Sequence, residues 1–577
     1  MSEKIILLKW ASKFLLRYLK IIIILILIIT ISTAIGIFMP LLNKEVIDKG
    51  ILKNNLNYVL IITGISIALN LLDRGLQLIQ TYYYSKISNL FSFNLQSKVF
   101  KKLLKLPLKF YNDTNATQLL STIGLDVSNV STICDNSVIF IVSDFLRIIG
   151  SLVGLFLISP ILALLGLLVI PLKIIVNARY STIKEKAYEE LIIANEDFSN
   201  WYGDTLDGIK EIKLLGIKQK IIKKYVRLQR PIVKTNIRFN ILDQWLSFWD
   251  GNLSEWSSEL TFIVGAILVI NQKLTFGALF AFTSYLGLVY GPLSNIISLR
   301  YMFAGFFPSA KRLKDLFSLP EEEPAKTTPA LIKNDQNLPI ISFHNVNFNY
   351  SDQHQTLKNV SFTINRGEKI AIIGANGSGK TTIFNLLLGF YKINSGKILI
   401  NGLPIEKIPL KQLRQIITTV TQDTYLFNNT IEENLNLCLK KHQVDPFEKL
   451  SVQKMLSMLK EFPQGLATPI GQNGVQLSGG QRQKIAITRA LVRNSSIILM
   501  DEATSQLDIN SEHEINELLY NIDQEVTTLI ITHRPYILKH VDKVIVMKDG
   551  EVIAFGKHHS LLESTNAYQQ ILQAHGF

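Results

Sequence analysis

The chain has 577 residues, of which 48% are apolar and 18% are charged, and its formal net charge is +14. This length exceeds what one hydrophobic core usually supports, so two domains are expected. The positive charge could suit a nucleic-acid partner. The basic residues, however, lie in the segments between long apolar runs, which is the positive-inside bias of a membrane protein. We therefore expect a lipid bilayer and no nucleic acid as a partner.

Six apolar segments approach the roughly 20 residues that a helix needs to cross a bilayer. They lie at approximately residues 21–42, 57–80, 138–158, 161–178, 249–270 and 275–299. The first run is too long for a cleavable signal peptide, and further runs follow it. Ser159-Pro160 reads as a turn between the third and fourth segments. The N-terminal half is thus predicted to be a six-span helical membrane domain.

Charge predicts the orientation of these spans. Basic residues gather in the N-terminal tail, between spans two and three, and between spans four and five from Lys173 to Arg238. The opposite loops are short and nearly neutral. We expect a multi-pass protein of the cytoplasmic membrane with both termini in the cytosol. Cys134 and Cys438 would then be reduced structural thiols.

The two long inner segments still read as helix. Leu90 to Leu108 and Ile209 to Val226 mix apolar and basic residues at helical spacing. We expect membrane helices that extend well into the cytosol, with a short element joining each pair. A separate soluble insert is the alternative.

A polar stretch punctuated by Pro320, Pro324 and Pro329 marks a linker. We expect a membrane domain at 1–319, a linker at 320–339 and an α/β domain at 340–577. In the last region strand patterns at 341–350, 360–364 and 369–373 come before a glycine-rich loop.

That loop fits the phosphate-cradling pattern in full and lies between a strand and a helix. Its glycines would let backbone N–H groups approach phosphates, Lys380 would reach the β and γ phosphates, and Thr381 would hold Mg²⁺. The candidate phosphate-binding residues are Gly374, Asn376, Gly377, Ser378, Gly379, Lys380, Thr381 and Thr382. The pattern predicts ATP and Mg²⁺ as cofactors.

Two carboxylates end a later buried-strand pattern at Ile497 to Met500. Asp501 could serve Mg²⁺ through water, and Glu502 could polarise the attacking water as a general base. Adjacent acids at a strand end can also be ordinary surface charges, but the phosphate loop upstream favours the catalytic interpretation.

Between the two motifs lies Leu477-Ser478-Gly479-Gly480-Gln481, which matches the ABC signature, and the order of motifs resembles that of ABC ATPases. The resemblance implies roles for four further sites. Tyr350 would stack on adenine, Gln422 would touch Mg²⁺ and sense the membrane domain, and His533 would contact the γ-phosphate as a switch. Ser505 to Asp508 resembles the loop that crosses the dimer interface.

The membrane half resembles the exporter type of the same family. Phe110 to Thr114 followed by Leu119, Leu120 and Asp126 looks like its first coupling region, and Asp207 to Gly216 looks like its second. Some positions depart from the family pattern. Thr117 stands where glycine is frequent and Thr122 where arginine is common, and Gly471 to Gly474 lacks the usual acid and base.

The resemblance implies a head-to-tail dimer in which each ATP lies between the phosphate loop of one chain and Ser478, Gly479 and Gly480 of the other. Because the chain holds both halves of a complete site, a homodimer is favoured, with a heterodimer as the alternative. The expected function is ATP-driven export of a drug-like compound, peptide or lipid. Flipping of a lipid or lipid-linked precursor and a membrane ATPase without cargo remain open.

Ionisable residues within spans are functional candidates. Glu255 and Glu259 lie four residues apart in span five, with Trp249 and Trp256 nearby, which would suit a cationic amphipathic cargo. The alternative is that the acids lie near headgroups and the tryptophans form an interfacial belt. Asp144 and Arg147 lie three apart and are expected to neutralise one another.

Overall fold

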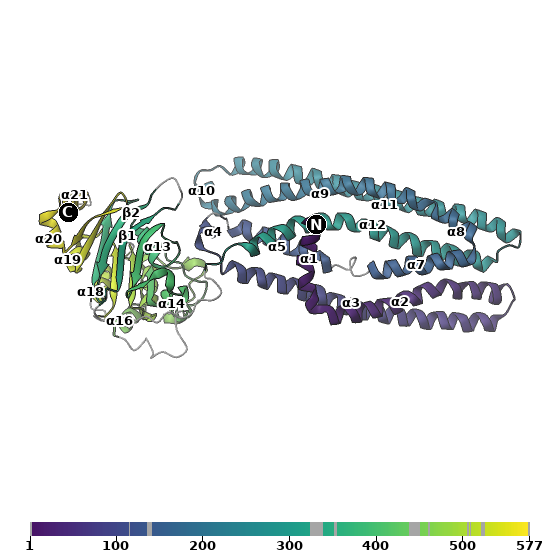
Figure 1. Ribbon diagram of the computed structural model, residues 1–577, viewed down its shortest axis with the longest axis horizontal. Helices are drawn as coiled ribbons and strands as arrows, with labels where there is room; N and C mark the ends of the chain where they lie inside the picture. The colour runs from purple at the N-terminus through teal and green to yellow at the C-terminus, as the bar shows by residue number, and fades with distance from the viewer. Residues whose placement is uncertain are drawn as a thin grey trace. The chain divides into compact units, whose positions relative to one another are not determined.

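The computed structural model describes residues 3–112, 114, 116–134, 141–322, 338–350, 355–437, 450–459, 462–504, 507, 509–520 and 525–574. The chain forms two compact units, one of Met1–Leu106 with Phe110–Glu321 and one of Pro107–Lys109 with Glu322–Phe577. In its described residues the first unit is helical, and the second mixes helices with two sheets (Figure 1). The expected fold class, a helical membrane part and an α/β part, is confirmed.

The described α-helices of residues 3–318 range from 5 to 53 residues in length. They are α1 (Glu3–Leu15), α2 (Leu19–Glu45), α3 (Leu56–Leu103), α4 (Leu108–Asn112), α5 (Ala116–Ser131), α7 (Ile141–Ile158), α8 (Pro160–Leu167), α9 (Val169–Asp207), α10 (Ile209–Leu214), α11 (Lys218–Ile270) and α12 (Phe276–Ser318). Of these, α4 begins in the Pro107–Lys109 segment of the second unit. At 1.5 Å per residue, α3 and α11 are about 70 and 80 Å long, more than twice the roughly 30 Å of a bilayer core. Helices that cross a bilayer therefore continue far beyond it.

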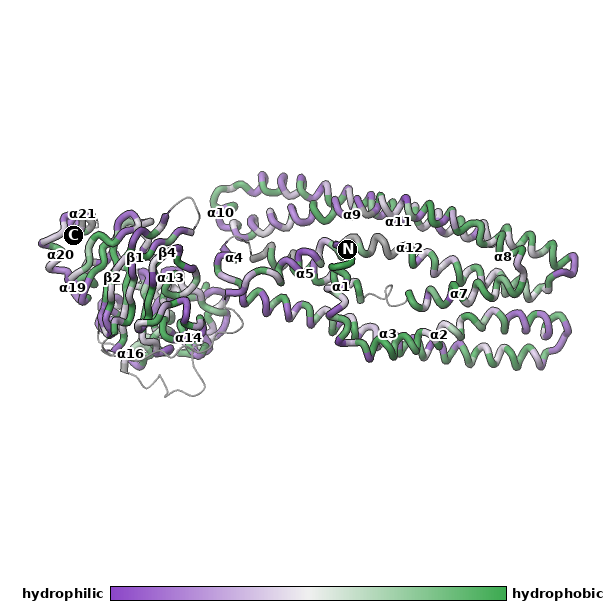
Figure 2. The backbone as a smooth tube through the Cα atoms, viewed as in Figure 1, coloured by the Kyte–Doolittle hydropathy of each residue, from purple (hydrophilic) through white to green (hydrophobic). Residues whose placement is uncertain are grey.

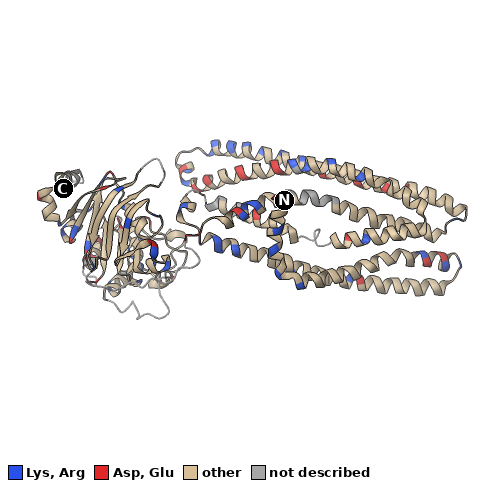
Figure 3. Cartoon of the chain, in the orientation of Figure 1, with Lys and Arg blue, Asp and Glu red and all other residues tan. Residues whose placement is uncertain are grey.

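Six helical stretches among the described residues are long and apolar enough to cross a membrane. Figure 2 shows apolar residues running along α2, α7 and α8. Figure 3 shows that charged residues gather on the parts of α9 and α11 nearest α10 and become sparse toward α8. The third expected span begins at residues 138–140, which lie outside the described residues.

The inner segments are helical, but neither is one unbroken helix. α3 ends at Leu103, four residues before Pro107, whose ring disfavours helical backbone in the residue before it. Between α10 and α11 the chain turns at Gly216, whose φ of +64° lies in the left-handed region. The long helices α9 and α11 are thus joined by a short element, as expected, and the segment that resembles a second coupling region forms the turn between them.

The α/β unit contains two sheets. A four-stranded antiparallel sheet has the order β2 (Leu357–Ile364), β1 (Ile341–Phe348), β4 (Ser395–Ile400) and β5 (Leu403–Pro404). A six-stranded sheet has the order β10 (Glu551–Gly556), β9 (Lys543–Lys548), β3 (Lys369–Gly374), β8 (Thr527–Ile531), β7 (Ile497–Asp501) and β6 (Ile417–Val420). Only β10 is antiparallel to its neighbour in the second sheet.

Both faces of the six-stranded sheet are buried. Along β3, Ile370 and Ile372 belong to a core shared with the four-stranded sheet and α13 (Lys380–Leu387), whereas Ala371 and Ile373 belong to a second core. Side chains of a strand alternate between faces, so a strand covered on both sides reads as a continuous apolar run. The remaining helices of the unit are α14 (Leu410–Ile416), α15 (Ile431–Asn436), α16 (Leu450–Leu459), α17 (Gly479–Val492), α18 (Ile509–Tyr520), α19 (Pro535–His540), α20 (His558–Ser564) and α21 (Asn566–Ala574).

Candidate nucleotide-binding site

The glycine-rich loop joins the end of β3 to the start of α13. A methyl group added at Gly374 would lie 2.3 Å from the carbonyl oxygen of Met547, so only glycine fits between the loop and β9. Gly379, directly before the helix, has φ of +97°. These two positions let the chain turn sharply into α13, and the N–H groups of its first turn, which lack partners within the helix, can bind an anion.

The side chain of Lys380 lies over this loop. Its Nζ donates hydrogen bonds to the carbonyl oxygens of Gly374 (2.7 Å) and Ala375 (3.0 Å). Burial lowers the pKa of Lys380, an effect opposed by the nearby carboxylates of Glu502 and Asp501. The ammonium is therefore held among backbone carbonyls, and a phosphate would give it a charged partner.

Ser378 shows that the loop fits an anionic group. Its side chain is buried, and its Oγ has no hydrogen-bond partner within the described part of the chain. A buried hydroxyl without a partner is costly unless something supplies one. A phosphate oxygen in the loop would accept its proton, so the residues present fit a nucleotide.

The two predicted carboxylates lie beside the loop. Asp501 ends β7, and its Oδ2 accepts a hydrogen bond from Thr381 Oγ1 at 3.1 Å. Burial raises the pKa of Asp501, while the Thr381 hydroxyl acts in the opposite direction. Hydroxyl, amide and carboxylate oxygens are the ligands that Mg²⁺ prefers, so Thr381, Asp501 and Gln422 form a suitable donor set.

Glu502 follows Asp501 and is held from both sides. Gln422 Nε2 donates to its Oε2 at 3.0 Å, and His533 Nε2 lies 3.3 Å from its Oε1. Its backbone has φ of +47°, which is rare for a residue with a side chain, and its N–H donates to the carbonyl of Ile531 at 3.1 Å. Strained backbone of this kind is typical of residues whose side chain must point in one direction.

Tyr350 lies just after β1 and is 40% exposed. Its hydroxyl donates to Thr382 Oγ1 (3.3 Å) and accepts from Asn385 Nδ2 (3.0 Å). The ring of Tyr391 meets it edge-on at 4.9 Å. The ring is therefore fixed in place next to α13, with surface free for a base to stack on. Asn385 and Tyr391 were not singled out from the sequence, since no motif contains them.

The signature residues begin α17. Ser478 is the N-cap, and its Oγ accepts from the N–H of Gln481 (3.2 Å) while its own N–H donates to Gln481 Oε1 (2.9 Å). The signature is thus also a capping box, which fixes the helix start and leaves the N–H groups of Gly479 and Gly480 pointing away from it. Among the described residues, no hydrogen bond joins the signature to the phosphate loop.

Three further predicted features lie outside the phosphate loop, the acidic pair and the signature. Asp508, with Ser505 and Gln506, falls outside the described residues, as does Cys438, whereas Cys134 is buried and in the thiol form. Asn473 adopts φ of +50°, and its Oδ1 accepts from the N–H of Leu426 at 3.4 Å. Asn473, one of the neutral residues at 471–474, therefore forms a hydrogen bond within the α/β unit.

All four candidate cargo residues lie on α11, with Glu255 and Glu259 one turn apart. Glu255, Glu259 and Trp256 are exposed, and Trp249 is partly buried against the ring of Phe248. In span three, Asp144 is buried and accepts from Asn295 at 3.5 Å.

The charge of Arg147 acts on Asp144, and the Nε of Arg147 is buried without a hydrogen-bond partner inside the described residues. The expected neutralisation of the two charges stays a prediction.

Comparisons with known proteins agree with this geometry. The description "ABC transporter transmembrane region" matches residues 22–293, and "ABC transporter" matches residues 357–505. The chain is 28% identical to a putative multidrug export ATP-binding/permease protein of Bacillus subtilis, with 97% of each chain covered. It is 29% identical to an ATP-dependent lipid A-core flippase of Wigglesworthia glossinidia brevipalpis, with 92% of this chain and 91% of the relative covered.

A solved structure of a bacterial Atm1-family ABC exporter with ATP bound has the same fold. The TM-score is 0.86, and the match covers 97% of this chain and 99% of the other at 22% identity. At that identity the likeness concerns the arrangement of elements rather than the cargo.

Proposed function

Because this chain belongs to the ABC transporter family, with the membrane region and the ATP-hydrolysing domain in one polypeptide, we propose that it is an ATP-driven exporter that works as a homodimer. Residues 1–319 form the membrane domain and 340–577 the ATPase domain, joined by a linker at 320–339. Both termini lie in the cytosol, and the six spans cross the cytoplasmic membrane.

The observation that carries the proposal is the pairing of Glu502 with Gln422 and His533 beside the phosphate loop. Glu502 accepts the proton of the water that attacks the γ-phosphate. His533 holds the other oxygen of that carboxylate and contacts the γ-phosphate. Lys380 and the loop N–H groups bind the β and γ phosphates.

Magnesium completes the site. When bound, Mg²⁺ neutralises charge that develops on the phosphates. Thr381, Gln422 and Asp501 would hold it, directly or through water. Asp508 would contact the opposite subunit at the dimer interface.

The other half of each site comes from the second chain. Ser478, Gly479 and Gly480 lie at the N-terminus of α17, where backbone N–H groups and the helix dipole favour an anion. Gln481 keeps that helix start rigid through the capping box. A heterodimer with a similar chain is the alternative assembly.

Export follows if ATP binds the closed dimer more tightly than the open one, because only differential affinity moves a conformational equilibrium.

The cargo is a drug-like compound, a peptide or a lipid, and relatives named as multidrug exporters and lipid flippases support this range. Exposed Glu255 and Glu259, with Trp249 and Trp256, would favour a cationic amphipathic cargo. The alternatives are flipping of a lipid or lipid-linked precursor and ATP hydrolysis without cargo.

One assay separates these functions. The full chain is purified, reconstituted in phospholipid vesicles, and assayed for ATPase activity with a panel of cationic drugs, peptides and lipids. Export predicts that one class raises the ATPase rate and that the same class accumulates in inside-out vesicles only with ATP. Stimulation by lipid with movement between leaflets would indicate flipping. An ATPase rate that no compound changes, with no compound moved across or within the membrane, would argue against transport.

A further inference from the structure

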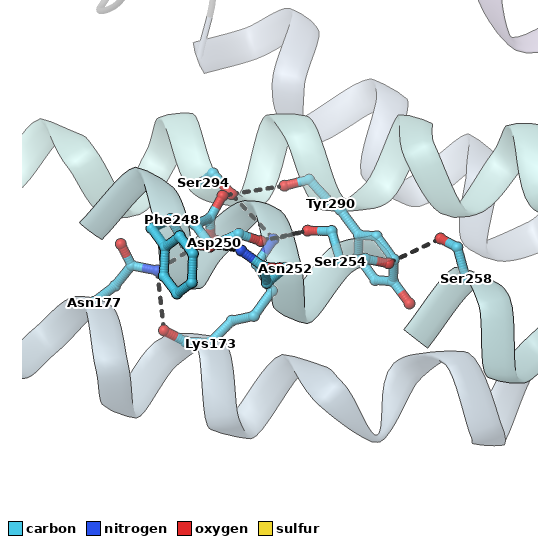
Figure 4. A network of polar contacts seen from close by, with 9 residues as sticks. All are labelled: Lys173, Asn177, Phe248, Asp250, Asn252, Ser254, Ser258, Tyr290 and Ser294. Carbon is cyan, nitrogen blue, oxygen red and sulfur yellow. Dashed lines mark hydrogen bonds and ion pairs between the residues drawn. The ribbon is translucent and has the colours of Figure 1, made fainter. Parts of the chain in front are cut away.

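A charged cluster lies inside the membrane unit where α9, α11 and α12 meet (Figure 4). Lys173 of α9 is fully buried, and its Nζ lies 3.1 Å from Asp250 Oδ1 of α11. The same ammonium donates to Ser254 Oγ (2.7 Å) and Ser294 Oγ (3.2 Å). Each of its three protons therefore has an acceptor, and all three acceptors come from other helices.

The carboxylate of Asp250 is equally well satisfied. It accepts from Asn177 Nδ2 at 3.3 Å and from Ser294 Oγ at 2.7 Å, in addition to the ammonium. Burying two charges in a membrane protein costs solvation that the pair itself barely recovers. Such a pair is therefore better explained by control of helix position than by stability.

The same two helices stay in one register from this cluster toward α10. Lys184 pairs with Asp243, the rings of Tyr188 and Phe239 lie 6.0 Å apart, and those of Phe198 and Tyr225 lie 5.7 Å apart. Over residues 173 to 198 of α9 this series covers about 38 Å, at 1.5 Å per residue. The helices cannot slide past each other without breaking every contact in the series.

Among the described side chains of the third helix, none brings a charge to the cluster. α12 supplies the hydroxyl of Ser294 and the ring of Tyr290, whose centroid lies 5.1 Å from Lys173 Nζ. If α12 moved away, the ammonium and the carboxylate would still hold each other. The cluster thus joins α9 to α11 strongly and α12 to both weakly.

We propose that Lys173 and Asp250 are positioning residues of the transport cycle. The pair holds α9 and α11 together as one arm that keeps its geometry as the membrane unit changes state, while α12 packs against it. The arm includes the turn at 207–216. The role of the arm in transport rests on the proposed ATP-driven function, but its rigidity does not.

Two measurements on the full chain in phosphatidylglycerol–phosphatidylethanolamine vesicles test the proposal. Spin labels on Asp197→Cys and Arg230→Cys, in a Cys134→Ser/Cys438→Ser background, report the distance between α9 and α11. We expect Lys173→Met and Asp250→Asn to broaden this distance distribution. They should also lower the kcat for ATP at least about 5-fold with KM within about 2-fold, a split that impaired nucleotide binding would not give.

The double variant Lys173→Asp/Asp250→Lys restores the pair in reverse. We expect it to narrow the distance distribution and to recover at least about half of the lost kcat, since coupled residues are not additive. The matched control is Arg238→Gln/Glu190→Gln, which removes an exposed ion pair of 3.4 Å between the same helices. An exposed pair contributes little, so the control should stay within about 2-fold of wild type.

The possible results distinguish failure of the positioning role from misfolding of a variant and from failure of the proposed function. Single variants with wild-type distances and kcat, or a reversed pair as impaired as the single variants, would overturn the positioning role. If Lys173→Met does not fold, Asp250→Asn and the reversed pair carry the test, because they keep the volume and polarity of the cluster. If wild type itself hydrolyses no ATP, the proposed function fails, while the distance measurement still decides the role of the pair.

Discussion

Glu502 combines a strained backbone with a side chain that is held at both oxygens. The left-handed φ of +47° costs free energy, and the contacts to Gln422, His533 and the carbonyl of Ile531 offset it. A solvent-exposed glutamate without a fixed orientation would not need contacts that offset backbone strain. The carboxylate is therefore positioned before ATP arrives, as a general base requires.

Glu502→Gln keeps the shape of the side chain and removes its basicity. We expect ATP to bind with an affinity close to wild type and hydrolysis to fall by about 10²- to 10⁴-fold, the usual contribution of a general base. A fluorescent ATP analogue measures binding, and phosphate release measures turnover. Hydrolysis at the wild-type rate would remove Glu502 from this role.

Substitution of Gly374 tests whether the phosphate loop must pack closely against β9. In Gly374→Ala the new methyl group would meet the carbonyl oxygen of Met547 at 2.3 Å and Ser378 Oγ at 2.7 Å, so the loop must shift. We expect the Kd for ATP to rise well beyond tenfold. Gly377→Ala is the control, because its methyl group meets nothing within 4 Å and only φ of +82° is strained. That strain is about 1–2 kcal/mol, or roughly a tenfold effect.

At this scale the motifs predicted the ATP site better than they predicted its surroundings. The phosphate loop, Asp501 and Glu502 could be predicted from the sequence because each needs one residue type at one spacing. Asn385 and Tyr391, which fix Tyr350, could not, since they reach it only through folding. Lys173 was read as one of the inner basic residues, whereas the structure buries it against Asp250, because sequence spacing does not reveal a partner on another helix.

Among the helices, Arg312 joins α12 to two neighbours. Its Nε and Nη2 donate to both oxygens of buried Asp126 on α5, at 3.0 and 2.6 Å, and its Nη1 lies 3.2 Å from Glu196 of α9. The forked geometry suits only arginine. The contact thus holds three helices at one level of the membrane unit.

Removing the guanidinium leaves Asp126 buried without its partner. We expect Arg312→Ala to lower the stability of the membrane unit by about 2–3 kcal/mol, below the 3–5 kcal/mol of a fully buried pair because Arg312 is partly exposed. Scanning calorimetry of the full chain in detergent measures the shift. Lys311→Ala, which breaks only an exposed pair with Glu3, should leave the transition nearly unchanged. Equal shifts for the two variants would contradict this account.

α20 and α21 of the ATPase domain are joined by a hydrogen bond of 2.6 Å between His558 Nδ1 and the Tyr568 hydroxyl. Burial, and then the neighbouring His559 and Lys539, hold the pKa of His558 below its usual 6.5. Below pH 6.5 the unfolded chain therefore binds a proton more readily than the folded chain, so stability falls as pH drops through 6.5.

We expect the apparent unfolding temperature of the ATPase domain, in the full chain, to fall between about pH 7.5 and 5.5. His558→Gln cannot take up the proton and should make that fall shallower, at some loss of stability near neutral pH. Calorimetry across this range measures both. An unchanged pH slope in the variant would mean that other groups cause the loss.

The helices themselves could be predicted from apolar length and charge, but their continuity could not. Apolar runs of about 20 residues indicate a span wherever they occur. The breaks at Pro107 and Gly216 depend on backbone preferences at single residues within otherwise helical patterns. Nothing in the sequence indicated that α9 and α11 keep one register, because that follows from side chains far apart in the chain.

For the whole molecule, the decisive feature is that the phosphate loop and the signature belong to the same unit without a hydrogen bond between them in the described residues. In the proposed site Lys380 and Glu502 belong to one half, and Ser478 at the start of α17 belongs to the half that binds the second nucleotide. In a symmetric head-to-tail dimer each site would then take one half from each chain. A homodimer makes this arrangement testable by mixing subunits.

Lys380→Ala destroys the phosphate half of a site, and Ser478→Arg destroys the signature half. Dimers of either variant alone have no intact site, so each should hydrolyse ATP at background rate. In a mixed dimer the Lys380 of one chain meets the Ser478 of the other, which restores one site of two. Equal co-expression gives mixed dimers in half of the population, so hydrolysis should return to about a quarter of wild type. Background activity in the mixture, with mixed dimers verified by two affinity tags, would rule out sites shared between identical chains and favour a heterodimer.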